Sequence, residues 1–246
     1  MKKRSWGAQR FFLLALLCGG GILSVTQSWA LDYCPGRVCR SYERASQRES
    51  MRGSIDHSLP GQFDFYVLAL TWSAEFCQRH QSASKQCVGN KNLGFVVHGL
   101  WPQYYNGYPL YCRNEATLST NALKKARDYF PTERLARYEW RKHGVCSGKT
   151  PNVYLEDVSR ARKLVKIPPL LLDPKTDQTI RLQALYGDFL KINPNLYPGM
   201  FSINCRRGVL TEVRVCISQN LRHYQLCPQV LEQSCRSSDI FIPSFH

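Results

Sequence analysis

The chain has one long apolar run in its middle, and this run predicts a strand buried on both faces. Residues 63–72 read FDFYVLALTW, with aromatic and aliphatic side chains at successive positions. A run without polar alternation is typical of a central strand covered from both sides. A second apolar run at 93–97 predicts another strand. Because Gly99 and Pro102 follow it, we expect His98 to lie at a strand end.

Apolar and polar residues alternate near the C-terminus. Residues 210–218 read LTEVRVCIS, so the two valines and Ile217 point to one face, whereas Glu212 and Arg214 point to the other. This alternation predicts a half-exposed antiparallel strand. A short apolar segment at 240–242 predicts one more strand.

Helical periodicity is clearest at 132–143, where Thr132 is a suitable N-cap and Gly144 ends the pattern. A polar loop that contains Cys77 and Cys87 separates the first two predicted strands. Strands mixed with clustered helices, without a regular βαβ rhythm, predict an α+β domain. The other predicted helices are at 119–130, 152–165 and 179–191.

The N-terminal residues have the features of a secretory signal. Four basic residues precede an apolar run, and Ala30 closes a small-x-small cleavage site. We expect 1–30 to be a cleaved signal, 31–60 a polar arm and 61–246 the folded domain of a secreted or periplasmic protein. No later stretch approaches the roughly 20 apolar residues of a membrane span, so we expect none.

The net charge narrows the kind of partner that the protein is expected to bind, and the cysteines indicate disulfide bonds. The formal net charge is +15, and +11 remains without the four basic residues of the signal. Such a protein is expected to meet a polyanion, whether nucleic acid, an anionic membrane surface or an acidic polysaccharide.

Ten of the eleven cysteines follow the signal. We expect five disulfides, because no CxxC pair or HxxxH cluster indicates a metal site.

One predicted helix has an unusual polar stripe. Glu139, Lys142 and His143 share a helix face with Leu135 and Ala136, where a surface helix ordinarily keeps apolar residues. The neighbouring carboxylate and the helix C-terminus both favour imidazolium, so we expect a raised pKa for His143.

Two histidines are the main candidates for catalysis. Either His98 or His143 alone is more often a structural residue, but together two imidazoles can serve as acid and base. Lys142 adds positive charge for a developing anion. Without metal ligands, this set favours cleavage of a phosphodiester by an internal nucleophile, and RNA supplies one in its 2′-hydroxyl.

The motifs then resemble a known family. HGLWP at 98–102 and EWRKHGVC at 139–146 closely resemble the two active-site segments of the ribonuclease T2 family, and 63–72 resembles its first core strand. The C-terminal segments INC, VRVCIS, LCP and SCRSSDIFIPSF follow its closing strands. This resemblance covers most of 61–246 and implies a single disulfide-rich α+β domain, with a central antiparallel sheet flanked by helices.

The resemblance also implies a reaction. His143 would be the general base, His98 the general acid, and Glu139 and Lys142 would support the pentacoordinate phosphorus. The expected protein is a monomeric endoribonuclease that cleaves single-stranded RNA with low base specificity. It would form 2′,3′-cyclic phosphates and hydrolyse them slowly to 3′-phosphates, without metal or cofactor.

Four further residues are expected to contact substrate. Trp101 and Tyr108 resemble the aromatic pair around one base, although Trp101 also fits the interpretation of a core residue. Gln103 stands where relatives carry Asp or Asn, and Tyr138 stands where they usually carry histidine. A tyrosine offers at most a neutral hydrogen bond to a phosphate, so we expect weaker substrate binding. Thr71 replaces a glutamine, which leaves a second base site open.

The same resemblance implies a pairing of the cysteines. Cys112–Cys146 would tie the loop after His98 to the end of the helix with His143. The remaining pairs would be Cys34–Cys39, Cys77–Cys87, Cys205–Cys235 and Cys216–Cys227.

One alternative comes from another class of protein. A cationic cytotoxic protein on the same fold would bind RNA or membranes without turnover, but charge alone does not need the four polar residues. A metal-dependent nuclease or phosphatase would need a carboxylate cluster, and the sequence has none.

Overall fold

The computed structural model describes residues 59–80, 85–87 and 93–245. The expected signal, the arm up to residue 58 and the expected Cys34–Cys39 pair lie outside the described residues. Within them, six strands form one sheet in the order β2-β1-β5-β6-β3, and β4 also pairs with β5. The strands are β1 Phe65–Trp72, β2 Phe95–Gln103, β3 Gln178–Arg181, β4 Phe201–Arg206, β5 Val209–Ser218 and β6 Asp239–Ile242.

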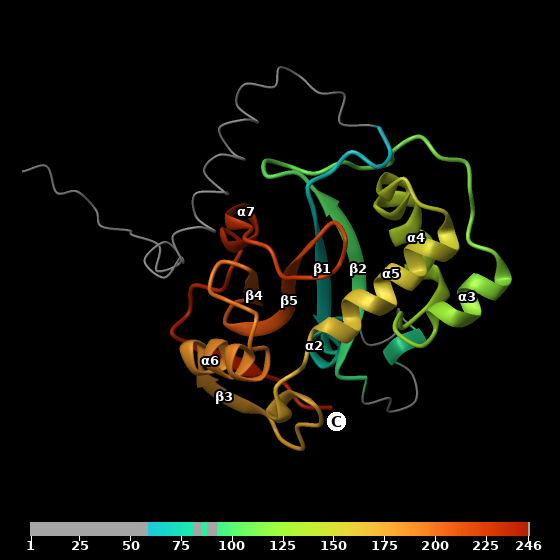
Figure 1. Ribbon diagram of the computed structural model, residues 1–246. Helices are drawn as coiled ribbons and strands as arrows, with labels where there is room; N and C mark the ends of the chain where they lie inside the picture. The colour runs from blue at the N-terminus through green and yellow to red at the C-terminus, as the bar shows by residue number, and fades with distance from the viewer. Residues whose placement is uncertain (1–58, 81–84, 88–92, 246) are drawn as a thin grey trace, which may run out of the picture.

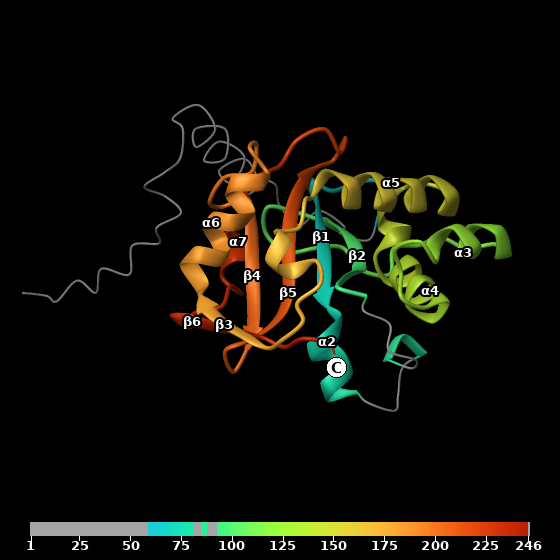
Figure 2. The ribbon, with the colours of Figure 1, turned by 90° about the horizontal axis from the view of Figure 1, so that it is seen from below.

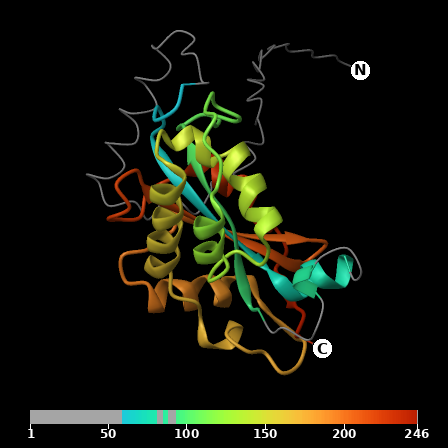
Figure 3. The same cartoon turned by 90° about the vertical axis from the view of Figure 1, so that its right-hand side faces the viewer.

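Helices flank this sheet. The α-helices are α2 Ser73–Arg79, α3 Thr120–Ala126, α4 Glu133–Lys142, α5 Pro151–Leu164, α6 Leu182–Ile192 and α7 Pro228–Leu231, and the short 3₁₀ turns are η1 Lys85–Cys87, η2 Gly144–Ser147 and η3 Pro169–Leu171. Figure 1 shows α3, α4 and α5 beside β1 and β2, and α6 and α7 beside β4. Figure 3 shows α3, α4 and α5 in front of β1 and β2.

The strand pairing confirms the predicted α+β fold class. β1 pairs antiparallel with β2 on one side and with β5 on the other, and β4 and β5 form an antiparallel hairpin. The one parallel contact joins Val209 of β5 to Phe241 of β6. A mainly antiparallel sheet with helices against it is the expected architecture.

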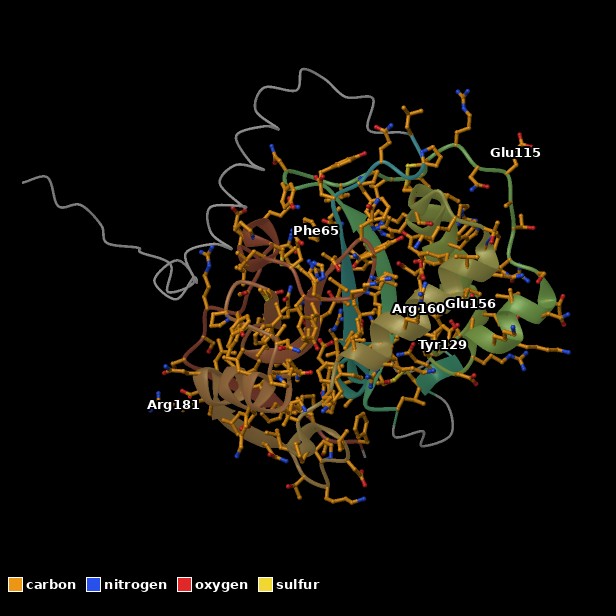
Figure 4. The ribbon with its side chains drawn as sticks, viewed as in Figure 1. Phe65, Glu115, Tyr129, Glu156, Arg160 and Arg181 are labelled. Carbon is orange, nitrogen blue, oxygen red and sulfur yellow. A yellow bond between two sulfur atoms is a disulfide. The ribbon has the colours of Figure 1, made fainter. Side chains whose placement is uncertain are left out.

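β1 is the central strand that its apolar sequence predicts. Phe65, Tyr66, Leu68 and Leu70 are all fully buried. Tyr66, Leu68 and Leu70 belong to the main core beneath the helices, whereas Phe65 packs in a smaller cluster on the opposite face. Figure 4 shows side chains filling the space between sheet and helices, and labels Phe65 near one end of β1.

The helix around the polar stripe forms as predicted. Thr132 caps α4 by accepting a hydrogen bond from the backbone N–H of Leu135, at 3.1 Å. His143 is the residue just after the helix, and η2 begins at Gly144. The cap places the start of α4, so Glu139 and Lys142 lie in its last two turns.

Two other segments differ from their predictions. Residues 179–181 form most of β3 rather than the start of a helix, because they pair with β6, and α6 begins at Leu182. The segment with Cys77 is not a loop but α2, whose Ser73 and Ala74 are buried. In both cases tertiary pairing and packing outweigh local pattern.

The prediction that His98 ends a strand is wrong. β2 continues through His98, Gly99 and Pro102 as far as Gln103. Proline is tolerated here because β2 is an edge strand of the described sheet, where a missing N–H costs no ladder bond. Between the pairs Ala69–Gly99 and Leu70–Val97, His98 is left without a partner on β1. His98 is therefore the extra residue of a β-bulge, a feature that re-aims a side chain.

Four disulfides link the described residues. Their pairs are those that the resemblance implies: Cys77–Cys87, Cys112–Cys146, Cys205–Cys235 and Cys216–Cys227. Cys112 precedes α3 and Cys146 lies in η2, so this crosslink attaches the segment after β2 to the chain just beyond His143.

Candidate active site

The polar residues of β2 and α4 meet around one indole ring. The Trp101 N–H donates a 2.7 Å hydrogen bond to Oε2 of Glu139. The Trp101 ring stacks on the imidazole of His143, with centroids 5.1 Å apart, and meets that of His98 edge-on at 5.2 Å. Nε2 of His98 lies 3.6 Å from Oε1 of Glu139. The structure thus brings together three of the four expected catalytic side chains, with Trp101 between the two histidines.

Lys142 lies next to this group. Its charge acts on both Glu139 and His143, and its Nζ lies 5.5 Å from the ring centroid of Tyr138. Tyr138 is 38% exposed, so the Lys142 ammonium lies beside a ring that reaches solvent.

Sequence reasoning missed Glu212. It lies in β5 opposite Thr71 of β1, and its Oε2 is 2.8 Å from Nδ1 of His98. Thr71 donates a hydrogen bond to the same oxygen, and Arg214 donates to the other at 2.6 Å. The alternation of β5 correctly separated Glu212 and Arg214 from the valines, but Glu212 is only 8% exposed. Only the order of the strands in the sheet shows that the Glu212 side chain of β5 contacts His98 of β2.

The carboxylates on either side of His98 shift its pKa. Burial by itself would lower the pKa of His98, but the hydrogen bond to Glu212 and the charges of Glu212 and Glu139 outweigh burial and raise it. Burial would also raise the pKa of Glu212, yet His98 and Arg214 hold it below its usual value. Glu139 has a raised pKa because its burial outweighs the influence of His98, Trp101 and Lys142. Of the two imidazoles around Trp101, His98 is thus the one whose pKa is raised.

The expected raised pKa of His143 is wrong. Burial is the main cause that lowers its pKa, to about 3, and the charges of Lys142 and His98 act in the same direction. The carboxylate expected to favour imidazolium, Glu139, contacts His98 and Trp101 instead. Nδ1 of His143 is buried without a hydrogen-bond partner among the described residues. His143 is therefore neutral over the ordinary pH range.

The expected substrate residues differ in exposure. Tyr108 is 55% exposed. Gln103 is buried, and its side-chain amide donates to the carbonyl of Pro102 at 3.0 Å. Trp101 is half-buried, and the guanidinium of Arg214 lies 5.3 Å from its ring centroid.

A cavity of about 560 Å³ opens beside His98, and we call it the His98 cavity. Its walls come from β1, β2, α2, α4 and the β4–β5 hairpin, and neither Lys142 nor His143 lines it. The cavity is thus lined by His98 but not by His143. Lining residues include Thr71, Arg79, Leu135, Tyr138, Asn204, Thr211, Glu212 and Arg214.

Comparison with known proteins identifies the family. Residues 63–227 match the Ribonuclease T2 family, and this range contains both histidine segments. The chain belongs to the ribonuclease T2 family. It is 41% identical to a ribonuclease from Aeromonas hydrophila, over 74% of this chain and 86% of that protein. It is 27% identical to ribonuclease DdI of Dictyostelium discoideum, over 79% and 91% of the two chains.

A solved structure supports the fold. An RNase-related protein from Calystegia sepium superposes with a TM-score of 0.62 at 21% identity, covering 75% of this chain and 99% of that one. Both the family membership and the T2-like fold predicted from the sequence motifs are confirmed.

Two features that would point to other ligands are missing from the residues that the structure describes. Those residues contain no group of three or more histidine, cysteine, aspartate or glutamate residues placed to hold a metal ion. None of the helices within 59–245 that the structure describes is long and apolar enough to cross a membrane.

Proposed function

We propose that this protein is an endoribonuclease that cleaves single-stranded RNA without a metal ion. One observation carries the proposal: two imidazoles with opposite pKa shifts lie on the same Trp101 ring. At mildly acidic to neutral pH, a neutral His143 is ready to accept a proton and a protonated His98 is ready to donate one. General acid–base catalysis needs such a pair.

The proposed first step is transphosphorylation. His143 removes the proton of the 2′-hydroxyl, the 2′-oxygen bonds to the adjacent phosphorus, and the bond from phosphorus to the 5′-oxygen breaks. His98 gives its proton to that leaving oxygen, which produces a 2′,3′-cyclic phosphate and a free 5′-hydroxyl. Because Nδ1 of His98 is held by Glu212, Nε2 is the nitrogen that delivers the proton.

A slow second step would open the cyclic phosphate. His98, now neutral, removes a proton from water, the water oxygen bonds to phosphorus, and the 2′-oxygen leaves with the proton held by His143. The product is a 3′-phosphate. Lys142 and Glu139 would support the pentacoordinate phosphorus in both steps, Lys142 through its positive charge.

The His98 cavity offers room for one of the two nucleotides that flank the cleaved bond. The leaving 5′-oxygen belongs to the nucleotide on the side of His98, so we place that nucleotide in the His98 cavity. Trp101 and Tyr108 would stack with the base that keeps the cyclic phosphate. Stacking contributes about 1–3 kcal/mol per base and tolerates any base, which fits low specificity.

The decisive experiment compares RNA and DNA as substrates in the presence of EDTA. We expect RNA degradation to cyclic phosphate ends, with DNA intact, and loss of cleavage in His98→Ala and His143→Ala. His223→Ala is the matched control, since His223 is exposed and lies in a loop. Cleavage that needs a divalent ion would refute the mechanism. RNA binding without cleavage would favour the cationic binding protein instead.

We also propose that the protein is a secreted or periplasmic monomer. Four disulfides among the described residues fit an oxidising compartment. Size-exclusion chromatography of the exported protein, with mass spectrometry of its N-terminus, tests both points and the cleavage after Ala30.

A further inference from the structure

A basic surface lies at the turn of the β4–β5 hairpin, next to the end of α2. Arg206 and Arg207 are both exposed, and neither has an ion-pair partner among the described residues. Together with Glu75, Gln78, Arg79 and His80 they line a surface depression of about 480 Å³, which we call the hairpin hollow. Figure 2 shows the hairpin turn and α2 at the same end of the molecule.

Arg207 occupies an unfavourable backbone conformation. Its φ is +52° and that of Gly208 is +79°, so the two-residue turn between β4 and β5 has positive φ at both positions. Such turns favour Asn-Gly or Asp-Gly, and an arginine has no local advantage at the first position. Strain of this kind is typical of functional positions. The cost of placing arginine here points to a use for its charge.

The hairpin hollow shares a wall with the His98 cavity. Arg79 lines both the hollow and the His98 cavity, and Asn204 and Thr211 of the same hairpin also line the cavity. Nε of Arg79 donates to Oε1 of the buried Glu75 at 2.5 Å, which holds the guanidinium at the junction. Since Glu75 already balances the charge of Arg79, Arg206 and Arg207 supply the net positive charge of the hollow.

We propose that the hairpin hollow binds backbone phosphates of RNA on the 3′ side of the cleaved bond, beyond the leaving nucleotide. This inference rests on the proposed function. His98 protonates the 5′-oxygen of the leaving strand, and His98 lines the His98 cavity, whereas His143 does not. A strand that leaves through this cavity passes Arg79 and reaches the two free guanidinium groups. These groups match phosphate in charge and in hydrogen-bond geometry.

The test varies RNA length on each side of one cleavable bond. The Arg206→Gln/Arg207→Gln variant should cleave a dinucleotide and a 5′-extended oligonucleotide like the unmodified protein. On a 3′-extended oligonucleotide we expect kcat/KM to fall about tenfold, as for the loss of two solvent-exposed charge contacts. The slope of log Kd for a non-cleavable 3′-extended analogue against log salt should decrease in magnitude by about 1.4 for two phosphates.

Two further variants separate this inference from simpler explanations. Lys124→Gln/Lys125→Gln removes the same charge from the exposed side of α3, outside both the cavity and the hollow, and should leave all three substrates unaffected. Arg207→Asn should raise the midpoint of thermal unfolding, because asparagine suits the turn, while still weakening cleavage of the 3′-extended substrate.

The possible results are distinct. An equal loss on all substrates, an equal loss in the α3 variant, or unchanged cleavage of the 3′-extended RNA by the double arginine variant would each overturn the inference. If the unmodified protein cleaves none of the RNAs, the proposed function itself fails.

Discussion

His98 is the residue whose chemistry depends most on its neighbours. Glu212 holds its Nδ1 at 2.8 Å, Glu139 lies 3.6 Å from its Nε2, and Trp101 packs against its ring. The two carboxylates keep a proton on the imidazole, and Glu212 also orients it. Glu212 is therefore a positioning residue, which acts on substrate through His98.

We expect Glu212→Gln to move the alkaline limb of the pH profile of kcat/KM to lower pH. The proposed acid needs its proton, so activity falls as pH rises through the pKa of His98. Removal of the carboxylate charge lowers this raised pKa. The acid limb depends on the low pKa of His143 and should stay in place.

The matched control is Glu232→Gln, because Glu232 is exposed. A profile in Glu212→Gln that loses height at every pH without moving its alkaline limb would show a merely structural role.

Tyr138 is one of the positions where we expect the chain to depart from its family pattern. We expect Tyr138→His to lower KM for RNA with little change in kcat, because an imidazolium beside Lys142 adds a charged partner for the phosphate. Tyr197→His is the control, since Tyr197 is similarly exposed at 39%. Steady-state kinetics on one oligonucleotide measures both constants. An unchanged KM contradicts this explanation of the substitution.

At the scale of the element, the bulge in β2 decides how the site is assembled. His98 has no partner on β1, so the strand bends there, and Gly99 lets Glu139 and the Trp101 indole approach the backbone. A β-carbon at Gly99 would overlap the Oε2 of Glu139 and the Nε1 of Trp101. The absence of a side chain at 99 is thus a condition for the 2.7 Å hydrogen bond between them.

Gly99→Ala should therefore damage the site more than the fold. We expect a loss of about 1–3 kcal/mol in the free energy of unfolding, as for an overpacked interior, and a large fall in kcat. Denaturant titration and kinetics measure the two effects. Gly187→Ala is the control: nothing lies within 4 Å of its added β-carbon, and it should stabilise α6 by about 0.5–1 kcal/mol. Unchanged kcat in Gly99→Ala would argue against the proposed assembly.

At the scale of the molecule, crosslinks connect segments that are far apart in sequence. Cys112 and Cys146 are 34 residues apart, and their bond connects the segment after β2 with the end of α4. Tyr129, in the segment after α3, also contacts α5. Its hydroxyl donates a hydrogen bond to the carbonyl of Leu155 at 3.0 Å, and Tyr129 is labelled in Figure 4. The disulfide thus links the chain just beyond His143 to the segment after β2, and the hydrogen bond links the segment after α3 to α5.

Removal of the Cys112–Cys146 bond in a double alanine variant should cost about 3.8 kcal/mol of stability by loop-closure entropy. Removal of Cys77–Cys87, whose residues are 10 apart, should cost about 2.7 kcal/mol. We expect kcat to fall in the first variant beyond what the fraction unfolded explains, and to stay unchanged in the second. Equal kcat for the two folded variants would show that the first bond does not position His143.

Particular residues show which features of the fold and the site could be predicted from the sequence. The apolar run of β1 predicted a buried strand, and Thr132 predicted the start of α4, because burial and capping are local or nearly local properties. The motifs around His98 and His143 indicated the family, which the comparisons confirm. The pattern failed at β3, since a four-residue strand forms there only through pairing with β6. It also failed at His98, because a bulge is defined by the partner strand.

The sequence by itself determined most of the elements, the family and the identity of the chemical groups, because these depend largely on residue type and short-range order. Only the tertiary structure decided the electrostatics. Burial reversed the expected pKa shift of His143, and β5 brought Glu212 to His98 from 114 residues away. A pKa depends on which charges and how much solvent surround a group in space, and neither is written in the spacing of residues along the chain.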